Sequence, residues 1–153
     1  MIKLVLAGAD DARLARFHAG IYMDAFAAQQ EPLDVWQRAL RGELPYELTV
    51  RLAVDPLRDA ILGGIAYELY PRSRCGLMTY MVVAPEVRGR GLGEQLFREA
   101  AGELRARGAK AVLGEVQAPS GWRGSSAGAR ACSTCRTCSR PSRPDCRATR
   151  AWS

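Results

Sequence analysis

Three glycines alternate with two arginines and a leucine in the stretch Arg88-Gly89-Arg90-Gly91-Leu92-Gly93. An apolar run, residues 77–84, precedes this stretch, and a strongly helical run, residues 94–107, follows it. Glycines let backbone N–H groups approach an anion closely, and the dipole at the start of a helix favours negative charge there. The arginines add fixed positive charge. The pattern therefore predicts a site for a ligand that bears phosphate.

Two familiar phosphate-binding motifs do not match this stretch. The dinucleotide fingerprint is Gly-x-Gly-x-x-Gly, and here the third glycine, Gly93, comes one residue too early. A P-loop requires Gly-Lys-Ser/Thr, which is also missing. A plain helix start leaves the glycines unexplained, because each glycine inside a helix costs roughly 1 kcal/mol relative to alanine. We therefore interpret this stretch as a phosphate-binding turn of another kind, for a ligand that carries a pyrophosphate.

Residues 83–93 resemble the acyl-CoA-binding motif of the GCN5-related N-acetyltransferase (GNAT) superfamily. That motif is Arg/Gln-x-x-Gly-x-Gly/Ala after a Val-x-Pro strand end. Arg88, Gly91 and Gly93 stand at the motif positions, and Leu92 fits its aliphatic slot. The resemblance is specific over residues 77–119.

The resemblance implies acetyl-CoA as co-substrate and an amine as acceptor, either a small molecule or a protein. It places the CoA pyrophosphate on the backbone N–H groups of six residues: Arg88, Gly89, Arg90, Gly91, Leu92 and Gly93. It also implies that the strand edge holds the pantetheine arm as an added strand would, through Met81, Val82 and Val83. An N–H group near Val83 would polarise the thioester carbonyl, which the amine then attacks.

The attacking amine needs a base, and the sequence offers two carboxylates on strands expected near the cleft, Glu68 and Glu115. Each could act through a water molecule, and a solvated strand carboxylate is the alternative for each. His18, the only histidine, is expected to be a partly exposed helix residue, because no catalytic constellation points to it. The superfamily's tyrosine acid has no counterpart, since no tyrosine follows Tyr80.

The hydrophobic pattern predicts a domain over residues 1–120 with an α/β fold, an α+β mixed sheet. Strands are expected at residues 2–7, 46–54, 60–70, 76–83 and 111–117, and the last of these is expected to pair with the motif strand. Helices are expected after Asp10 or Asp11, from Pro32 to Gly42, and over residues 92–107. Gly63-Gly64 predicts a bulge or a close backbone approach. The expected architecture is a GNAT-like central sheet flanked by helices.

Residues 121–153 have a different composition, with no Val, Leu, Ile, Phe, Met, Tyr, Lys or Glu. Such a segment buries too little apolar surface to offset the entropy of ordering it, so we expect disorder. The closing strands and last helix of the GNAT fold would have to come from this tail, and we expect the sheet to lack its final strands. The abrupt change in composition suggests that the tail is translated out of frame. The coding DNA tests this, because a shifted frame near codon 120 should then encode a β-rich continuation.

The formal net charge of +6 lies entirely in this tail, which holds seven arginines and one aspartate. Residues 1–120 balance fifteen basic against fifteen acidic side chains, so nucleic-acid binding by the domain is not expected. Nucleic-acid binding by the arginine-rich tail, through its contacts to phosphates, is one alternative function for the chain. The tail cysteines fit neither ferredoxin nor zinc-finger spacing, and no metal site is predicted: Cys132, Cys135, Cys138 and Cys146.

The start of the chain, residues 1–8, has too short an apolar run for a secretory signal, and no run approaches the roughly 20 residues of a membrane span. We therefore expect a cytoplasmic protein with no membrane partner. The sequence predicts an N-acetyltransferase that uses acetyl-CoA. The alternative is a truncated, catalytically silent acyl-CoA-binding domain, and formation of a homodimer stays open.

Overall fold

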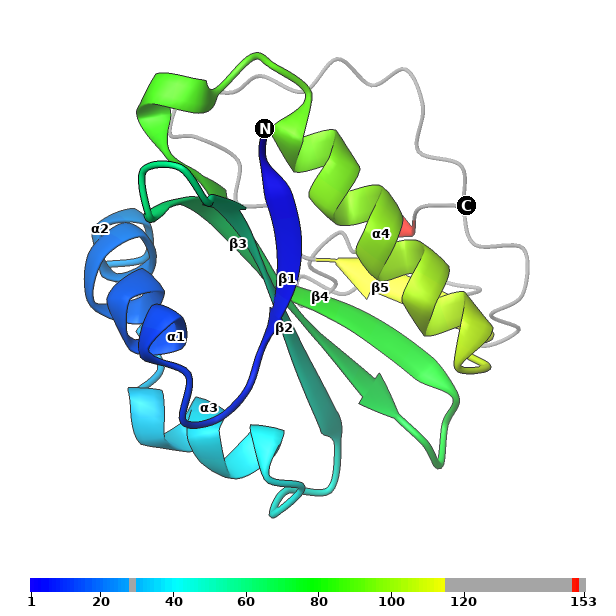
Figure 1. The fold of residues 1–153 in the computed structure, drawn as a ribbon. Helices are drawn as coiled ribbons and strands as arrows, with labels where there is room; N and C mark the ends of the chain where they lie inside the picture. The colour runs from blue at the N-terminus through cyan, green and yellow to red at the C-terminus, as the bar shows by residue number, and fades with distance from the viewer. Residues whose placement is uncertain (28–29, 115–149, 152–153) are drawn as a thin grey trace.

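The computed structural model describes residues 1–27, 30–114 and 150–151. Its strands form one sheet in the order β1-β2-β3-β4-β5-β6 (Figure 1). Their bounds are β1 Lys3–Ala7, β2 Glu47–Asp55, β3 Ala60–Tyr70, β4 Cys75–Val83, β5 Ala111–Gly114 and β6 Arg150–Ala151. Strands β1 to β4 are antiparallel neighbours, β5 runs parallel to β4, and β6 is antiparallel to β5. The mixed sheet confirms the predicted fold class and the predicted pairing of β4 with β5.

Helices cover both faces of the sheet (Figure 1). One face carries α1 Ala12–Phe17, a π-helical turn η1 His18–Tyr22, α2 Met23–Ala25 and α3 Leu33–Leu40. The other face carries α4 Leu92–Ala106, which follows a 3₁₀ turn η2 Pro85–Val87. Asp11 caps α1 by accepting a hydrogen bond from the backbone N–H of Arg13, as the sequence predicts.

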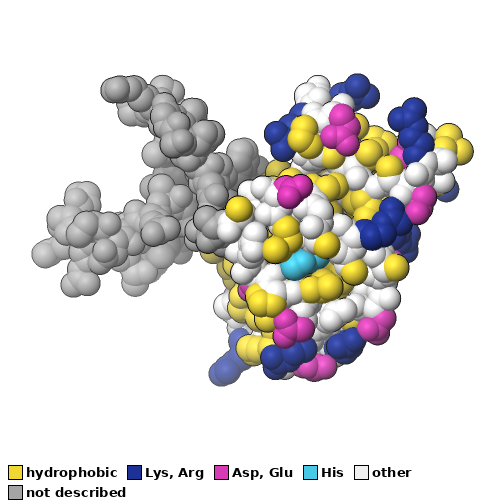
Figure 2. Space-filling model, turned by 90° about the vertical axis from the view of Figure 1, so that its left-hand side faces the viewer, with side chains coloured by type: hydrophobic (Ala, Val, Ile, Leu, Met, Phe, Trp, Pro, Cys, Tyr) yellow, Lys and Arg dark blue, Asp and Glu magenta, His cyan; other side chains and the backbone are white. Residues whose placement is uncertain are grey.

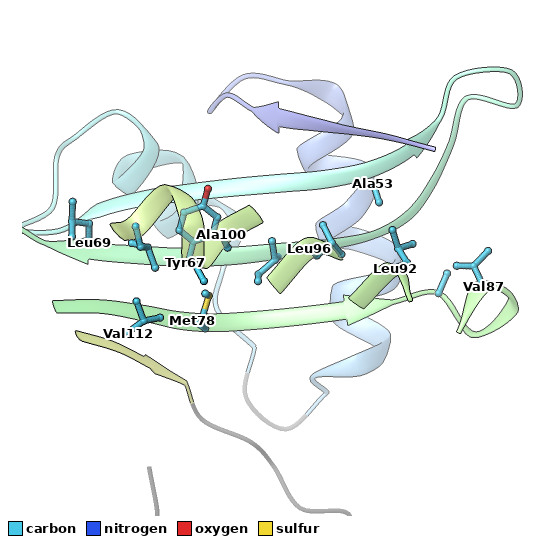
Figure 3. Packing of buried hydrophobic residues seen from close by; sticks show 13 residues of the cluster. Ala53, Tyr67, Leu69, Met78, Val87, Leu92, Leu96, Ala100 and Val112 are labelled. Carbon is cyan, nitrogen blue, oxygen red and sulfur yellow. The ribbon is translucent and has the colours of Figure 1, made fainter. Parts of the chain in front are cut away.

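The amphipathic helix α4 supplies one of the two cores. Its buried side chains Leu92, Leu96 and Ala100 belong to one hydrophobic cluster with Tyr67 and Met78 of the sheet (Figure 3). The second core lies on the opposite face, where Phe17, Tyr22 and Trp36 pack on β2 and β3. The sheet thus has one face packed on α4 and one face packed on the N-terminal helices.

A β-bulge in β4 changes which face its side chains meet. Tyr67 of β3 lies opposite Met78, but the preceding residue Ala66 lies opposite Tyr80, so Thr79 is the extra residue. Met78 packs against the α4 side, whereas Tyr80 packs against the N-terminal helices. Bulges commonly redirect a side chain in this way next to functional sites.

The glycine pair of β3 combines both features predicted for it. The register between β2 and β3 shifts beside Gly63, because Ala53 pairs with Gly63 and Val54 pairs with Ile61. A Cβ on Gly63 would lie 2.7 Å from the Val82 carbonyl oxygen. A Cβ on Gly64 would lie 2.8 Å from the Phe17 ring. The prediction of a bulge or a close approach is confirmed on both counts.

The C-terminal region contributes only β6 to the described structure. These two residues pair with Leu113 and Gly114 of β5. The rest of the tail, and residues 115–117 of the strand predicted at 111–117, lie outside the described residues. The predicted disorder of the tail therefore stays a prediction there. None of the helices in the described part is long and apolar enough to cross a membrane.

A half-buried ion-pair network joins α4 to the sheet. The carboxylate of Glu103 accepts hydrogen bonds from Arg51 of β2 and from the Tyr67 hydroxyl of β3, both at 2.6 Å. Burial raises the pKa of Glu103, but the Tyr67 hydroxyl and the Arg51 guanidinium together outweigh it and hold the pKa below its ordinary value. The charged form of Glu103 therefore stabilises the fold.

Replacing Glu103 with alanine should destabilise the domain, because Arg51 would keep a half-buried charge without its partner. We expect the free energy of unfolding to fall by about 1–3 kcal/mol. Urea unfolding at neutral pH measures this loss, with the exposed Glu99→Ala on the same helix as control. Because the pKa of Glu103 is lowered in the fold, its contribution is present above its unfolded pKa and is lost as pH falls through its folded pKa. A loss of unfolding free energy equal to that of Glu99→Ala would contradict the stabilising role assigned to Glu103.

Candidate functional site

The glycine-rich turn between β4 and α4 presents an open backbone surface. Gly89 and Gly91 adopt left-handed φ angles of 74° and 78°, which glycine adopts without strain. A Cβ at either position would meet nothing within 4 Å. Gly91 is the N-cap of α4, and within the described residues no side chain caps this end of the helix. The first N–H groups of α4 are therefore free of side-chain acceptors and suited to an anion.

Two arginines flank these glycines with different roles. The Nε of Arg88 donates a hydrogen bond to the Val83 carbonyl oxygen at 2.9 Å, so it ties the turn to the end of β4. Arg90 is exposed and makes no hydrogen bond or ion pair within the described residues. The turn is thus held in shape by one arginine and carries an unneutralised positive charge on the other.

The motif residues on either side of the turn divide between buried and exposed positions. Leu92 is buried in the α4 core and anchors the helix start. A Cβ on Gly93 would lie 3.7 Å from a methyl group of Val83, so helix and strand meet closely there. Val82 is buried, while Met81 is 45% exposed, which is unusual for a large apolar strand residue. An exposed apolar side chain next to the turn suits the aliphatic part of a ligand.

Among the described residues, the end of strand β4 has a strand partner on only one side. It pairs with β5 over residues 75–78, and from Thr79 to Val83 its only strand partner among the described residues is β3. Backbone groups on the other edge of Met81–Val83 can then pair with an extended ligand. The structure places the nine predicted CoA-binding residues in one strand–turn–helix segment, in which Val82 and Leu92 are buried, and their role in binding stays a prediction: Met81, Val82, Val83, Arg88, Gly89, Arg90, Gly91, Leu92 and Gly93.

Glu68 lies on β3 opposite Leu77 of β4, on the face that the N-terminal helices cover. It is 6% exposed, and its carboxylate accepts a 2.6 Å hydrogen bond from the Tyr70 hydroxyl. Burial raises the pKa of Glu68 and the nearby Glu31 carboxylate adds to this, which together outweigh the hydrogen bonds of Tyr70 and Thr79 that lower the pKa. A carboxylate in this state is a better proton acceptor than an ordinary surface glutamate. Glu115, the second predicted base, lies outside the described residues.

His18 differs from its predicted environment. The sequence predicts a partly exposed helix residue, but His18 is 7% exposed, and its Nε2 lies 2.7 Å from the Glu31 carbonyl oxygen. Its ring also contacts Tyr22 and Trp36. Figure 2 shows the single histidine on the face of the N-terminal helices, set among mainly hydrophobic side chains. His18 therefore packs in the core and orients the chain before α3.

A group of aromatic side chains beside Glu68 is absent from the sequence-based site. The Tyr80 ring lies 5.0 Å from Tyr22, 5.1 Å from Phe26 and 5.7 Å from Trp36, measured between ring centroids. Regular alternation along β4 would place Tyr80 on the same face as Met78, and only the bulge at Thr79 turns it to this face.

Within the described residues, no group of three or more His, Cys, Asp or Glu side chains could hold a metal ion.

Comparison with protein families finds one match. The model of the acetyltransferase (GNAT) family matches residues 15–120, which is more than half of the chain. No curated protein matches the chain.

Solved structures share the fold. A tandem GNAT protein from the clavulanic acid biosynthesis pathway has a TM-score of 0.64 and 17% identity, over 82% of this chain and 40% of that one. An aminoglycoside acetyltransferase from an uncultured soil metagenomic sample, in complex with sisomicin, has a TM-score of 0.59 and 15% identity, over 76% and 78%. An N-acetyltransferase from Thermoplasma acidophilum in complex with coenzyme A has a TM-score of 0.52 and 13% identity, over 76% and 79%.

Proposed function

Because the chain belongs to the GNAT acetyltransferase family, we propose that it transfers an acetyl group from acetyl-CoA to an amine. The acceptor is a small molecule or a protein with a free amino group. The observation that carries this proposal is the open glycine turn at the uncapped start of α4. This turn offers backbone N–H groups and the free charge of Arg90 to the pyrophosphate of CoA. The free edge of β4 then receives the pantetheine arm.

The proposed reaction needs no covalent enzyme intermediate. The amine lone pair attacks the thioester carbonyl carbon, and the carbonyl oxygen gains negative charge that a β4 backbone N–H near Val83 stabilises. The C–S bond breaks, and the CoA thiolate leaves. The attacking nitrogen gives up a proton to the base, for which we propose Glu68. The products are an amide and CoA, and the proton count balances when the thiolate takes a proton from solvent.

The position of Glu68 indicates that its proton transfer runs through water. Its strand partner Leu77 lies four residues before Met81, about 13 Å along the chain at ~3.3 Å per residue. The bulge at Thr79 shortens this path only slightly. We therefore propose that the Glu68 carboxylate does not contact the amine directly, and that a chain of several water molecules carries the proton from the amine to it.

The full chain should release CoA thiol from acetyl-CoA in the presence of a suitable amine. A thiol-reactive dye measures this release, and mass spectrometry of the product should show the added acetyl group. The catalytically silent alternative predicts acetyl-CoA binding with no thiol release across a broad panel of amines. Failure to bind acetyl-CoA at all would overturn both.

A further inference from the structure

Strand β1 lies at one edge of the sheet, and among the described residues it pairs only with β2 (Figure 1). Within that part of the chain, its backbone makes no hydrogen bond outside this pairing, so its outer N–H and C=O groups can pair with another strand. Proteins usually protect such an edge with proline, a bulge or an inward-pointing charge. The sequence of β1 is Lys-Leu-Val-Leu-Ala, its register with β2 has no shift, and its one charge stands at its first residue.

The two faces of β1 are covered to different extents. Val5 and Ala7 pack with the N-terminal helices, whereas Leu4 packs against the α4 core. Side chains alternate along a strand, so Leu6 lies on the same face as Leu4. Leu6 is nevertheless 56% exposed, because α4 covers the neighbouring strands β2, β3 and β4 instead. An exposed leucine on an unprotected apolar edge indicates a surface that another strand covers.

The edge of β1 is complementary to a second copy of itself. Antiparallel pairing about a two-fold axis centred on Val5 places Lys3 opposite Ala7, and Leu4 opposite Leu6, of the second copy. All five strand residues then have a partner. The axis is perpendicular to the sheet, so each exposed Leu6 packs on a Leu4 of the same face. A two-fold interface uses the same patch on both copies, so the leucine contact forms twice.

The charges at the two ends of β1 agree with this pairing. Lys3 has no acidic partner among the described residues, and by alternation it lies on the face that the N-terminal helices cover. In the two-fold pair it stands opposite Ala7 of the second copy, which Asp10 follows three residues later. The Asp10 side chain is 82% exposed, and within the described chain only its Oδ1 is bonded, to Arg41 at 2.6 Å. Its second oxygen can accept the Lys3 ammonium.

We propose that two copies of this chain dimerise by pairing their β1 strands into one continuous sheet. The dimer is centred on Val5 and is held by the paired backbones, by two contacts between Leu4 and Leu6, and by two ion pairs between Lys3 and Asp10. One pair of short strands lies at the lower end of the roughly 1,200–2,000 Å² that specific interfaces bury, so the dimer dissociates at micromolar concentration. β1 and β4 are separated by two strands, so both proposed acetyl-CoA sites stay open.

Sedimentation equilibrium of the full chain tests the dimer, with a reductant to keep its five cysteines from linking chains. The mass should rise from 16.7 kDa toward twice that value as the concentration rises through the micromolar range. Leu6→Lys should keep the chain monomeric, because it places a lysine against Leu4 twice in the interface. Leu57→Lys is the control, since it replaces an 87% exposed leucine in the turn between β2 and β3. It should dimerise like the unsubstituted chain.

Cysteine substitutions test the register of the pair. In the proposed dimer the two Val5 Cα atoms are about 4.5–5.5 Å apart, which a disulfide can span. Mild oxidation of Val5→Cys should therefore give a covalent dimer, and mass spectrometry should find the bond between the two substituted residues. Leu6→Cys should not form this bond, because the two Leu6 residues lie on a diagonal of about 7–8 Å.

Three results would overturn the dimer proposal. They are a mass that stays at 16.7 kDa up to millimolar concentration, equal effects of Leu6→Lys and Leu57→Lys, and oxidised Val5→Cys that is linked only through other cysteines. Thermal unfolding of Leu6→Lys that matches the unsubstituted chain excludes misfolding as the cause of lost dimer. None of these measurements involves acetyl-CoA, so a failure of the dimer leaves the proposed function untouched.

Discussion

Gly91→Val should abolish acetyl-CoA binding while leaving the domain folded. A valine side chain at this position enters open space at the start of α4 and meets no protein atom within 4 Å at its Cβ. That space is where we place the pyrophosphate, so the side chain would displace it from the helix N–H groups. Losing two charge-assisted hydrogen bonds at about 1.5 kcal/mol each weakens binding by about 100-fold or more. Isothermal titration calorimetry measures the change.

The chain contains a matched control for the strain in this variant. Gly42, after α3, has a φ of 76° against 78° at Gly91, and its Cβ would also meet nothing within 4 Å. Gly42→Val should therefore cost the same roughly 1–3 kcal/mol of backbone strain. We expect it to bind acetyl-CoA like the unsubstituted chain. Normal acetyl-CoA binding by Gly91→Val, or an equal loss of affinity in Gly42→Val, would show that the pyrophosphate does not bind at this turn.

Glu68→Gln should lower kcat by about 100- to 10,000-fold, the usual contribution of a general base. Glutamine keeps the shape of the side chain and can still accept the Tyr70 hydrogen bond, but it takes up no proton. The affinity for acetyl-CoA should not change, because Glu68 lies away from the glycine turn. Steady-state thiol release at saturating acetyl-CoA gives kcat, and calorimetry gives the affinity.

The stability of Glu68→Gln separates a catalytic role from a structural one. Burial raises the pKa of Glu68, so the fold favours its protonated form, and the charged form costs stability above its unfolded pKa. Replacing it with neutral glutamine should therefore leave the melting temperature at pH 7 unchanged or raise it. A fall in both kcat and melting temperature would indicate that Glu68 supports the fold instead.

The CoA side of the site could be predicted from the sequence because it is local. Strand, turn and helix follow one another in residues 77–107, and Gly89 and Gly91 adopt left-handed φ angles in the turn. The helical period of Leu92, Leu96, Ala100 and Leu104 also indicates which face of α4 is buried. No long-range contact was needed to predict this order of strand, turn and helix.

The aromatic group around Tyr80 could not be predicted because it depends on contacts between residues far apart in the chain. Tyr80 reaches Tyr22 only because Thr79 adds one residue to β4, and a single bulge leaves no clear mark in the hydrophobic pattern. Glu31 reads as a loop residue, and its fixed position comes from Trp36, Tyr22 and His18. The same contacts explain why the expected exposure of His18 was wrong.

Titration of acetyl-CoA into the full chain is the most direct test of the account. The open turn, the uncapped start of α4 and the free edge of β4 predict saturable binding at one site per chain, competed by CoA. The affinity should fall as salt rises, because charge contributes to pyrophosphate binding. Absence of binding at millimolar acetyl-CoA by a folded chain would contradict the assignment of residues 81–93 as an acyl-CoA site.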